Sequence, residues 1–346
     1  MARVLIIHAS DTPDGGIVNA TLFYALALRS CGHEPVLWTA SRGLKALGDT
    51  FGVETVCDPA IKGGFSLFHP GLIARARRLR PGLGAVVHQG ARLFAFGRLW
   101  FSGVPEFVVF HNRKFGGRRR FSNWLAISET HCHELKDYVA AKGLKRTVGL
   151  IRNGPLPRHA ETLPPRVRGD ITIIGALSNF AVEKDTGLLI RAFAKLTDRH
   201  KQLRLVLAGD GPDAARCKAL AGELGVADRV SFPGWDKDTT AFYATLDLFC
   251  LSSREESFAL VAVEAMQAGL AVISTDTFGP RDIVIPGETG WLTPVGDVDA
   301  FSAAIAQALA CPALASEMGQ RGALRVKYLY APEPAGRVLE SALGLK

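Results

Sequence analysis

Short runs of apolar and β-branched residues alternate with longer segments of helical periodicity along most of the chain. In the first half, six runs predict β-strands, at residues 4–10, 35–39, 85–88, 107–111, 124–128 and 147–152. Between the first two runs, residues 17–30 place apolar side chains three and four positions apart, which predicts a helix. Such alternation predicts a parallel sheet with helices on both of its faces.

The alternation stops at residues 153–169, which contain four prolines and few apolar side chains, as is typical of a linker. It then resumes, with strands predicted at 171–177, 203–208, 230–233, 248–251 and 271–274 and helices at 186–196, 213–224 and 260–268. The chain is therefore expected to form an α/β domain at 1–155, a linker at 156–169 and a second α/β domain from 170. A cleft between two such Rossmann-like domains is where a ligand is expected.

Composition limits the class of protein. Hydrophobic residues make up 48% of the chain and charged residues 21%, which is the balance of a folded globular protein. The net charge of +8 favours an anionic partner without choosing among nucleotides, phosphorylated lipids and acidic membranes. Six scattered cysteines without a Cys-x-x-Cys pair indicate a reducing compartment, so we expect a cytoplasmic protein without disulfides. We read the first residues as a strand and not as a signal peptide, and expect no membrane span because no uncharged apolar stretch approaches about 18 residues.

The most informative segment is residues 254–274. Glu264 lies in the middle of a predicted helix that is apolar on nearly every face, where an unpaired carboxylate is costly to bury. It needs either a basic side chain or ligand hydroxyls, and a carboxylate can accept from both hydroxyls of a ribose. Glu256 lies just before the helix. The backbone between them offers N–H groups at a helix N-terminus, which attracts anions such as a diphosphate.

Residues 256–266 read ESFALVAVEAM, which resembles the E-x7-E signature of retaining family-4 glycosyltransferases of the GT-B fold, usually E-G-F-G-L-x-x-x-E-A-M. Four flanking segments agree with that resemblance. They are residues 173–196, with Lys184 near the usual diphosphate lysine, LRLVLAGDG at 203–211, GPRDIVIPGETGWL at 279–292 with Asp282 in place of the usual glutamate, and the glycine pair Gly15-Gly16 after the first strand. The resemblance is strong from about residue 170 to 310 and looser before that.

The resemblance implies a role for individual residues. Glu256 would bind hydroxyls of a donor sugar, Glu264 would bind the ribose, and His111 would face the reaction centre. The diphosphate would be held by Lys184 and the backbone of Ser257, Phe258, Ala259 and Leu260, while Gly15 and Gly16 would let backbone approach the phosphates. Trp235 is a candidate wall for the base. The catalytic set would be His111, Glu256 and Lys184, with the nucleotide-sugar as substrate and no cofactor or metal. As in similar proteins, a second domain at 170–321 would be followed by a helix at 322–346 that packs back on the first domain.

Some features leave alternatives open. Ala176 stands where the family usually has an arginine on the diphosphate, so either Lys184 acts alone or Arg281 or Arg254 substitutes. That alanine also motivates a non-catalytic sugar-nucleotide binding protein. A glycoside hydrolase using Glu256 and Glu264 as acid and nucleophile is a further alternative.

One more histidine and one more motif have competing interpretations. His88 also ends a predicted strand and rivals His111. The motif Asp236-Lys-Asp238 has metal-binding spacing, but helix capping explains it and no third ligand is near.

A basic run lies in the first half, with aromatic residues interleaved; its members are Arg113, Lys114, Arg118, Arg119 and Arg120. It is either a solvated loop or an acceptor-side patch that touches anionic lipid or a phosphorylated glycan. No nucleic-acid-binding motif accompanies it. The sequence thus predicts a retaining glycosyltransferase that acts on a cell-envelope glycan or glycolipid, cytoplasmic or peripheral at the inner face of the membrane.

Overall fold

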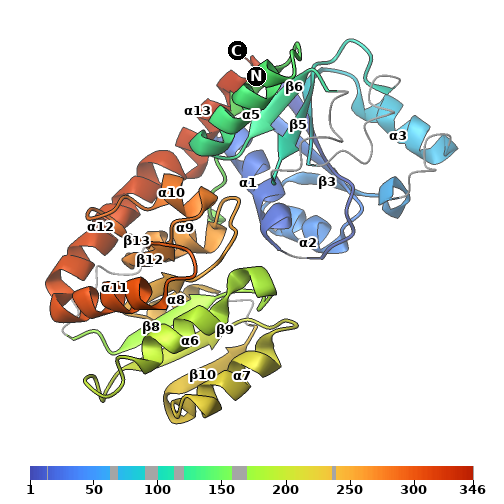
Figure 1. The fold of residues 1–346 in the computed structure, drawn as a ribbon. Coiled ribbons are helices and arrows are strands. Elements are labelled where there is room, and N and C mark those ends of the chain that lie inside the picture. The colour runs from blue at the N-terminus through green and yellow to red at the C-terminus, as the bar shows by residue number, and fades with distance from the viewer. Residues whose placement is uncertain are drawn as a thin grey trace. The chain divides into compact units, whose positions relative to one another are not determined.

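The computed structural model describes residues 1–13, 15–62, 69–89, 100–112, 121–157, 170–235 and 239–345. The chain divides into two compact units (Figure 1). Unit 1 comprises residues 1–156 together with 329–346, and unit 2 comprises residues 157–328. Each unit is built on one parallel sheet, as the alternating pattern predicted. Most of the predicted linker, residues 158–169, lies outside the described ranges.

Unit 1 contains a seven-stranded sheet in the order β3-β2-β1-β4-β5-β6-β7, in which all neighbouring strands are parallel. Its strands are β1 (Arg3–His8), β2 (Glu34–Thr39), β3 (Glu54–Cys57), β4 (Leu83–His88), β5 (Glu106–Phe110), β6 (Asn123–Ala126) and β7 (Thr147–Leu150). Its α-helices are α1 (Gly16–Ser30), α2 (Arg42–Thr50), α3 (Pro70–Leu79), α5 (Glu129–Ala141) and α13 (Pro332–Leu343). The edge strand β3 was not predicted, because only one of its four side chains is fully buried and its apolar signal is short.

Unit 2 contains a six-stranded parallel sheet in the order β10-β9-β8-β11-β12-β13. Its strands are β8 (Ile173–Leu177), β9 (Arg204–Ala208), β10 (Val230–Gly234), β11 (Leu248–Leu251), β12 (Val272–Thr275) and β13 (Gly290–Thr293). Its α-helices are α6 (Thr186–Ala194), α7 (Ala214–Glu223), α8 (Thr239–Thr245), α9 (Leu260–Gln267), α10 (Phe278–Ile283), α11 (Val298–Ala310) and α12 (Pro312–Leu329). The strand order reverses between β8 and β11. In sheets of this kind ligands bind beyond the carboxyl ends of the strands at that point.

The single helix expected at 322–346 is wrong, because two helices occupy this part of the chain. α12 ends at Leu329 and α13 begins at Pro332. Ala331, directly before the proline, has extended backbone with φ −71° and ψ 158°. A residue that precedes proline is disfavoured in helical conformation, so the helix ends here and a new one starts.

Helix α13 belongs to unit 1 and packs against α1. Their contact requires a glycine at position 336, because a Cβ there would lie 2.2 Å from the carbonyl oxygen of Ala27 and 2.7 Å from Sγ of Cys31. At the other end of the contact, Nε2 of the buried His33 lies 2.9 Å from Oε1 of Glu340. The backbone of α13 thus approaches α1 closely, and a polar pair fixes its position along that helix.

No single helix among the described residues is long and apolar enough to cross a membrane. Helices α11 and α12 pass that test of length and composition only as a pair, with a bend of 102° between them. All six cysteines fall within the described ranges and are free thiols.

The close contact at Gly336 can be tested by substitution with alanine. Gly336→Ala should lower the free energy of unfolding by about 1–3 kcal/mol, because the added methyl group overpacks the α1–α13 contact. The matched control is Gly222→Ala in α7, where nothing lies within 4 Å of the added Cβ. That control should be neutral or stabilising by about 0.5–1 kcal/mol. Chemical denaturation measures both variants, and equal effects would contradict the proposed overpacking.

Candidate functional site

Two loops meet at the carboxyl edge of unit 2, one after β8 and one after β11. Nζ of Lys184, from the first loop, donates to Oε1 of Glu256, from the second, at 2.6 Å. The two side chains are 21% and 11% exposed. The hydroxyl of Ser253 donates to the same carboxylate oxygen at 3.0 Å. Among the described residues no donor is recorded for Oε2 of Glu256, so this oxygen can accept from a ligand.

Backbone contacts hold these loops together. The amide N–H of Arg254 donates to the carbonyl of Glu183 at 2.7 Å, and the hydroxyl of Ser252 donates to the carbonyl of Lys184 at 3.1 Å. The Arg254 side chain also pairs with Asp185, with Nε 2.7 Å from Oδ2. The backbone on both sides of Lys184 is therefore held in place, and its side chain projects from a fixed position.

Helix α9 begins beside Glu256 with an unusual cap. Ala259 is its N-cap residue and has left-handed backbone, φ 70° and ψ 60°, with no side-chain hydrogen bond to the helix. An alanine side chain cannot accept a hydrogen bond, so the first N–H groups of α9 have no side-chain cap and can bind an anion. The family signature has glycine at this position, and the positive φ explains that preference.

Gly279 of α10 supports the loop that precedes α9. Its amide N–H donates to the carbonyl of Glu256 at 2.8 Å. A Cβ at position 279 would lie 2.4 Å from Cα of Phe258, so only glycine allows this approach. The glycine belongs to the GPRD segment singled out from the sequence, but its structural role there was missed.

Glu264 is 6% exposed in α9, as its apolar surroundings predicted. The hydroxyl of Tyr243, from α8, donates to its Oε2 at 2.9 Å. Burial, and then the neighbouring carboxylate of Glu264, raise the pKa of Tyr243, so its hydroxyl keeps its proton. The partner shown for Glu264 is thus a neutral hydroxyl. Tyr243 was not singled out from the sequence.

The alanine in the usual arginine position and the two arginines considered as replacements all have defined surroundings. Ala176 packs in the hydrophobic core of unit 2. Arg281 pairs with Asp276, its Nε 2.8 Å from Oδ1, in the same way that Arg254 pairs with Asp185. Of these bases and Lys184, only Lys184 contacts a carboxylate of the E-x7-E motif in the described contacts. Trp235 directly follows β10 and is 51% exposed, which leaves its ring accessible.

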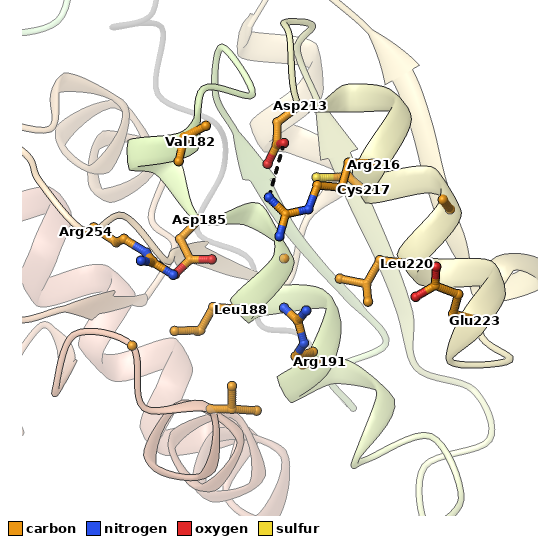
Figure 2. A pocket seen from close by; sticks show the side chains of 14 residues that line it. Val182, Asp185, Leu188, Arg191, Asp213, Arg216, Cys217, Leu220, Glu223 and Arg254 are labelled. Carbon is orange, nitrogen blue, oxygen red and sulfur yellow. Dashed lines mark hydrogen bonds and ion pairs between the residues drawn. The ribbon is translucent and has the colours of Figure 1, made fainter.

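A pocket of about 650 Å³ lies in unit 2 between α6 and α7 (Figure 2). Its lining has mixed charge, with Arg191, Arg216 and Arg254 beside Asp185 and Asp213. Nη1 of Arg216 is 3.7 Å from Oδ1 of Asp213. Neither carboxylate of the E-x7-E motif lines this pocket. A second groove, of about 420 Å³, lies beside α8 and has mainly apolar lining from Leu177, Ala208, Gly234 and Phe242, among others.

The glycine pair of unit 1 lies at the start of α1. Gly15 is the N-cap residue, with φ 111°, which disfavours any other residue. Outside the neighbouring backbone, no atom of the described residues lies within 4 Å of a Cβ added at either Gly15 or Gly16. The N-terminus of α1 is therefore open, although its contact with phosphates stays a prediction.

The two candidate histidines of unit 1 differ in their surroundings. His88, which ends β4, is buried and has its Nε2 2.9 Å from Oε2 of Glu106. His111 directly follows β5, is only partly buried, and has its Nε2 2.7 Å from Oε1 of Gln89. His88 is thus engaged with a carboxylate in the interior, while His111 is closer to solvent.

Several predicted residues lie outside the described ranges. They are Arg113, Lys114, Arg118, Arg119 and Arg120 of the basic run and Asp236 and Asp238 of the D-x-D motif. Within the described ranges, no group of three or more His, Cys, Asp or Glu side chains is arranged to hold a metal ion.

Comparison with solved structures defines the class of this fold. A structure of Anabaena HepE in complex with UDP and glucose superposes with a TM-score of 0.80 at 18% identity, covering 99% of this chain and 100% of the other. The apo form of the lipopolysaccharide outer core galactosyltransferase WaaB gives a TM-score of 0.75 at 18% identity and 99% coverage of both chains. The fold is the GT-B fold of glycosyltransferases, as the sequence predicted.

The sequence comparisons assign the second half to a family. Residues 165–325 match the family model described as glycosyl transferases group 1, and the E-x7-E segment falls inside the match. The lipopolysaccharide core biosynthesis glycosyltransferase LpsE of Rhizobium meliloti is 35% identical over 44% of this chain and 44% of its own length. N-acetyl-alpha-D-glucosaminyl L-malate synthase of Bacillus anthracis is 35% identical over 42% of this chain and 38% of its own. The chain thus spans about half or less of the length of these relatives, and its similarity to the glycosyltransferase family model is confined to residues 165–325.

The left-handed backbone of Ala259 predicts an unusual response to glycine. Ala259→Gly should leave the free energy of unfolding unchanged or raise it by up to about 1 kcal/mol, because released strain offsets the entropy of glycine. Ala262→Gly, three residues further into α9, should lower it by about 1 kcal/mol or more. Denaturant titration of both variants tests this contrast. Equal losses would show that position 259 is not strained.

Proposed function

We propose that this chain is a retaining glycosyltransferase that moves a sugar from a nucleoside diphosphate donor to an acceptor hydroxyl. The observation that carries the proposal is the meeting of Lys184 and Glu256 beside the open N-terminus of α9, at the point where the strand order reverses. This arrangement lies within the part of the chain that matches the glycosyltransferase family. It offers a positive charge, a helix N-terminus and two carboxylates to one extended ligand.

The donor would use these groups in order along its length. The diphosphate is proposed to lie against the first N–H groups of α9, where the helix dipole favours negative charge. The Lys184 ammonium has three donors, so it can bind a phosphate oxygen and still contact Glu256. Oε2 of Glu256 is then available for a sugar hydroxyl, and Glu264 accepts from the ribose beside its bond to Tyr243.

The same groups would support breakage of the glycosidic bond. As that bond breaks, negative charge builds on the diphosphate leaving group, and a positive charge already fixed in place stabilises it without reorganisation. Lys184 and the N-terminus of α9 supply that charge, so we propose that no divalent metal is needed. Retention of configuration, with His111 at the reaction centre, follows from the resemblance.

The donor and acceptor classes are proposed from the relatives. HepE has been crystallised with UDP-glucose, which supports a uridine donor as the first candidate. The groove beside α8 has an apolar lining suited to a flat base, and one of its lining residues, Gly234, directly precedes Trp235 in the sequence. Relatives named for lipopolysaccharide core biosynthesis support an acceptor on a cell-envelope glycan or glycolipid. We further propose that the basic run from Arg113 to Arg120 contacts the anionic inner face of the membrane.

One observation favours a second candidate, a sugar-nucleotide binding protein without turnover. Ala176, where the family has arginine, is buried in the hydrophobic core, so this position offers no charge to a diphosphate. Nucleotide binding with no sugar transfer to any acceptor would support this candidate. A hydrolase is less well supported, because it does not need the anion-binding helix N-terminus that lies beside Glu256.

Donor binding can be tested by thermal shift with UDP, GDP, ADP and CMP, each with and without EDTA. A nucleotide that binds only the folded protein raises its melting temperature, and we expect one clear, EDTA-insensitive response. Glu264→Gln should weaken that nucleotide about 10- to 100-fold, as expected for hydrogen bonds to a charged acceptor worth about 1.5–3 kcal/mol. Glu255→Gln, an exposed carboxylate one residue before Glu256, is the matched control and should bind normally. No response to any nucleotide would contradict the proposed function, and unchanged affinity in Glu264→Gln would remove its ribose contact.

A further inference from the structure

Gln89 and His111 lie next to each other at the carboxyl edge of the unit 1 sheet. Gln89 directly follows β4 and His111 directly follows β5, and these strands are paired in register from Val86 and Glu106 to His88 and Val108. Oε1 of Gln89 is 2.7 Å from Nε2 of His111. Adjacent strands therefore bring the two residues that follow them to the same edge of the sheet.

Gln89 is held firmly enough to position a neighbour. It is 6% exposed, and its amide N–H donates to the carbonyl of Ile7 at 2.9 Å, which ties it to β1. Among the described residues, its buried side-chain Nε2 has no hydrogen-bond partner. A buried amide nitrogen without a partner costs free energy. The contact that the described residues show for this side chain is therefore the one made by its oxygen.

We propose that Gln89 is a positioning residue that fixes His111 as the Nε2-protonated tautomer. A side-chain amide oxygen only accepts hydrogen bonds, so the imidazole nitrogen facing it must carry a proton. The basic nitrogen of a neutral His111 is then Nδ1. The proposal rests on the proposed function only where it concerns turnover, because the tautomer is a property of the unliganded protein.

The neutral amide of Gln89, which faces His111, differs from the partner of the neighbouring histidine, His88. His88 has a carboxylate, Glu106, 2.9 Å from its Nε2. An amide orients the ring and selects the tautomer without adding a negative charge.

The test reads the tautomer directly, by NMR of the full-length protein with ¹⁵N-labelled histidine and no substrate. His111, assigned with a His111→Asn variant, should show a protonated Nε2 and an unprotonated Nδ1. Gln89→Leu should abolish this preference and leave the melting temperature nearly unchanged, because it also removes the unpaired amide nitrogen. Gln89→Glu, which keeps an acceptor oxygen, should restore protonation at Nε2. Glu106→Gln is the matched control and should change the signals of His88 and leave those of His111 in place.

Turnover gives the second readout. With the donor found by nucleotide screening, Gln89→Leu should lower kcat at least tenfold while the KM for the donor stays within about twofold. A preserved Nε2–H tautomer in Gln89→Leu would overturn the proposal, and so would a lost tautomer with unchanged kcat. A wild-type protein that shows the predicted tautomer but no transfer would count against the proposed function alone.

Discussion

The ion pair between Lys184 and Glu256 is the interaction on which the candidate site depends. It joins the loop after β8 to the loop after β11, 72 residues apart in sequence and adjacent only because the sheet reverses its order there. At 21% and 11% exposure, both charged groups are largely removed from water, so neither is stable in this position without the other. The pair thus keeps a cation and a carboxylate ready at the edge of the sheet, where a charged, hydroxyl-rich ligand can share them.

Several residues that are not proposed to contact a ligand hold the two loops of this pair in place. Gly209 and Gly211, after β9, allow close approach of the loop after β8, since a Cβ at either would lie 1.8 Å from the carbonyl of Ser178 or 2.3 Å from that of Asn179. Gly279 does the same for the loop after β11. Strained backbone occurs on both sides, with positive φ at Phe180, Asp185 and Ala259. Strain concentrated at one edge of a fold is typical of a binding site, where the surrounding packing maintains it.

Much of this arrangement could be predicted from the sequence because its signals are local. Most strands of unit 2 and helix α9 are apolar segments, and the sequence places Glu256 just before this helix and Glu264 within it. The comparisons confirm the GT-B fold and a glycosyltransferase domain at residues 165–325. The roles of Glu256, Glu264, Lys184 and the glycine pair stay predictions from the motif.

Other features depend on contacts that no local pattern encodes. Tyr243 reaches Glu264 across 21 positions, and Gln89 reaches His111 across 22, through the pairing of strands and the packing of helices. The last helix was predicted wrongly because a single proline at 332 divides an otherwise continuous helical pattern. Strands β3 and β13 were not predicted, because only one of the four side chains of β3 and two of the four of β13 are fully buried.

The central claim is that a nucleoside diphosphate binds along the Lys184–Glu256–α9 edge of unit 2. A crystal structure with the nucleotide that stabilises the protein most tests this directly. We expect phosphate oxygens within hydrogen-bond distance of Nζ of Lys184 and of the first N–H groups of α9, with a ribose hydroxyl on Glu264. A nucleotide bound instead in the mixed-charge pocket between α6 and α7, with the Lys184–Glu256 pair untouched, would contradict it.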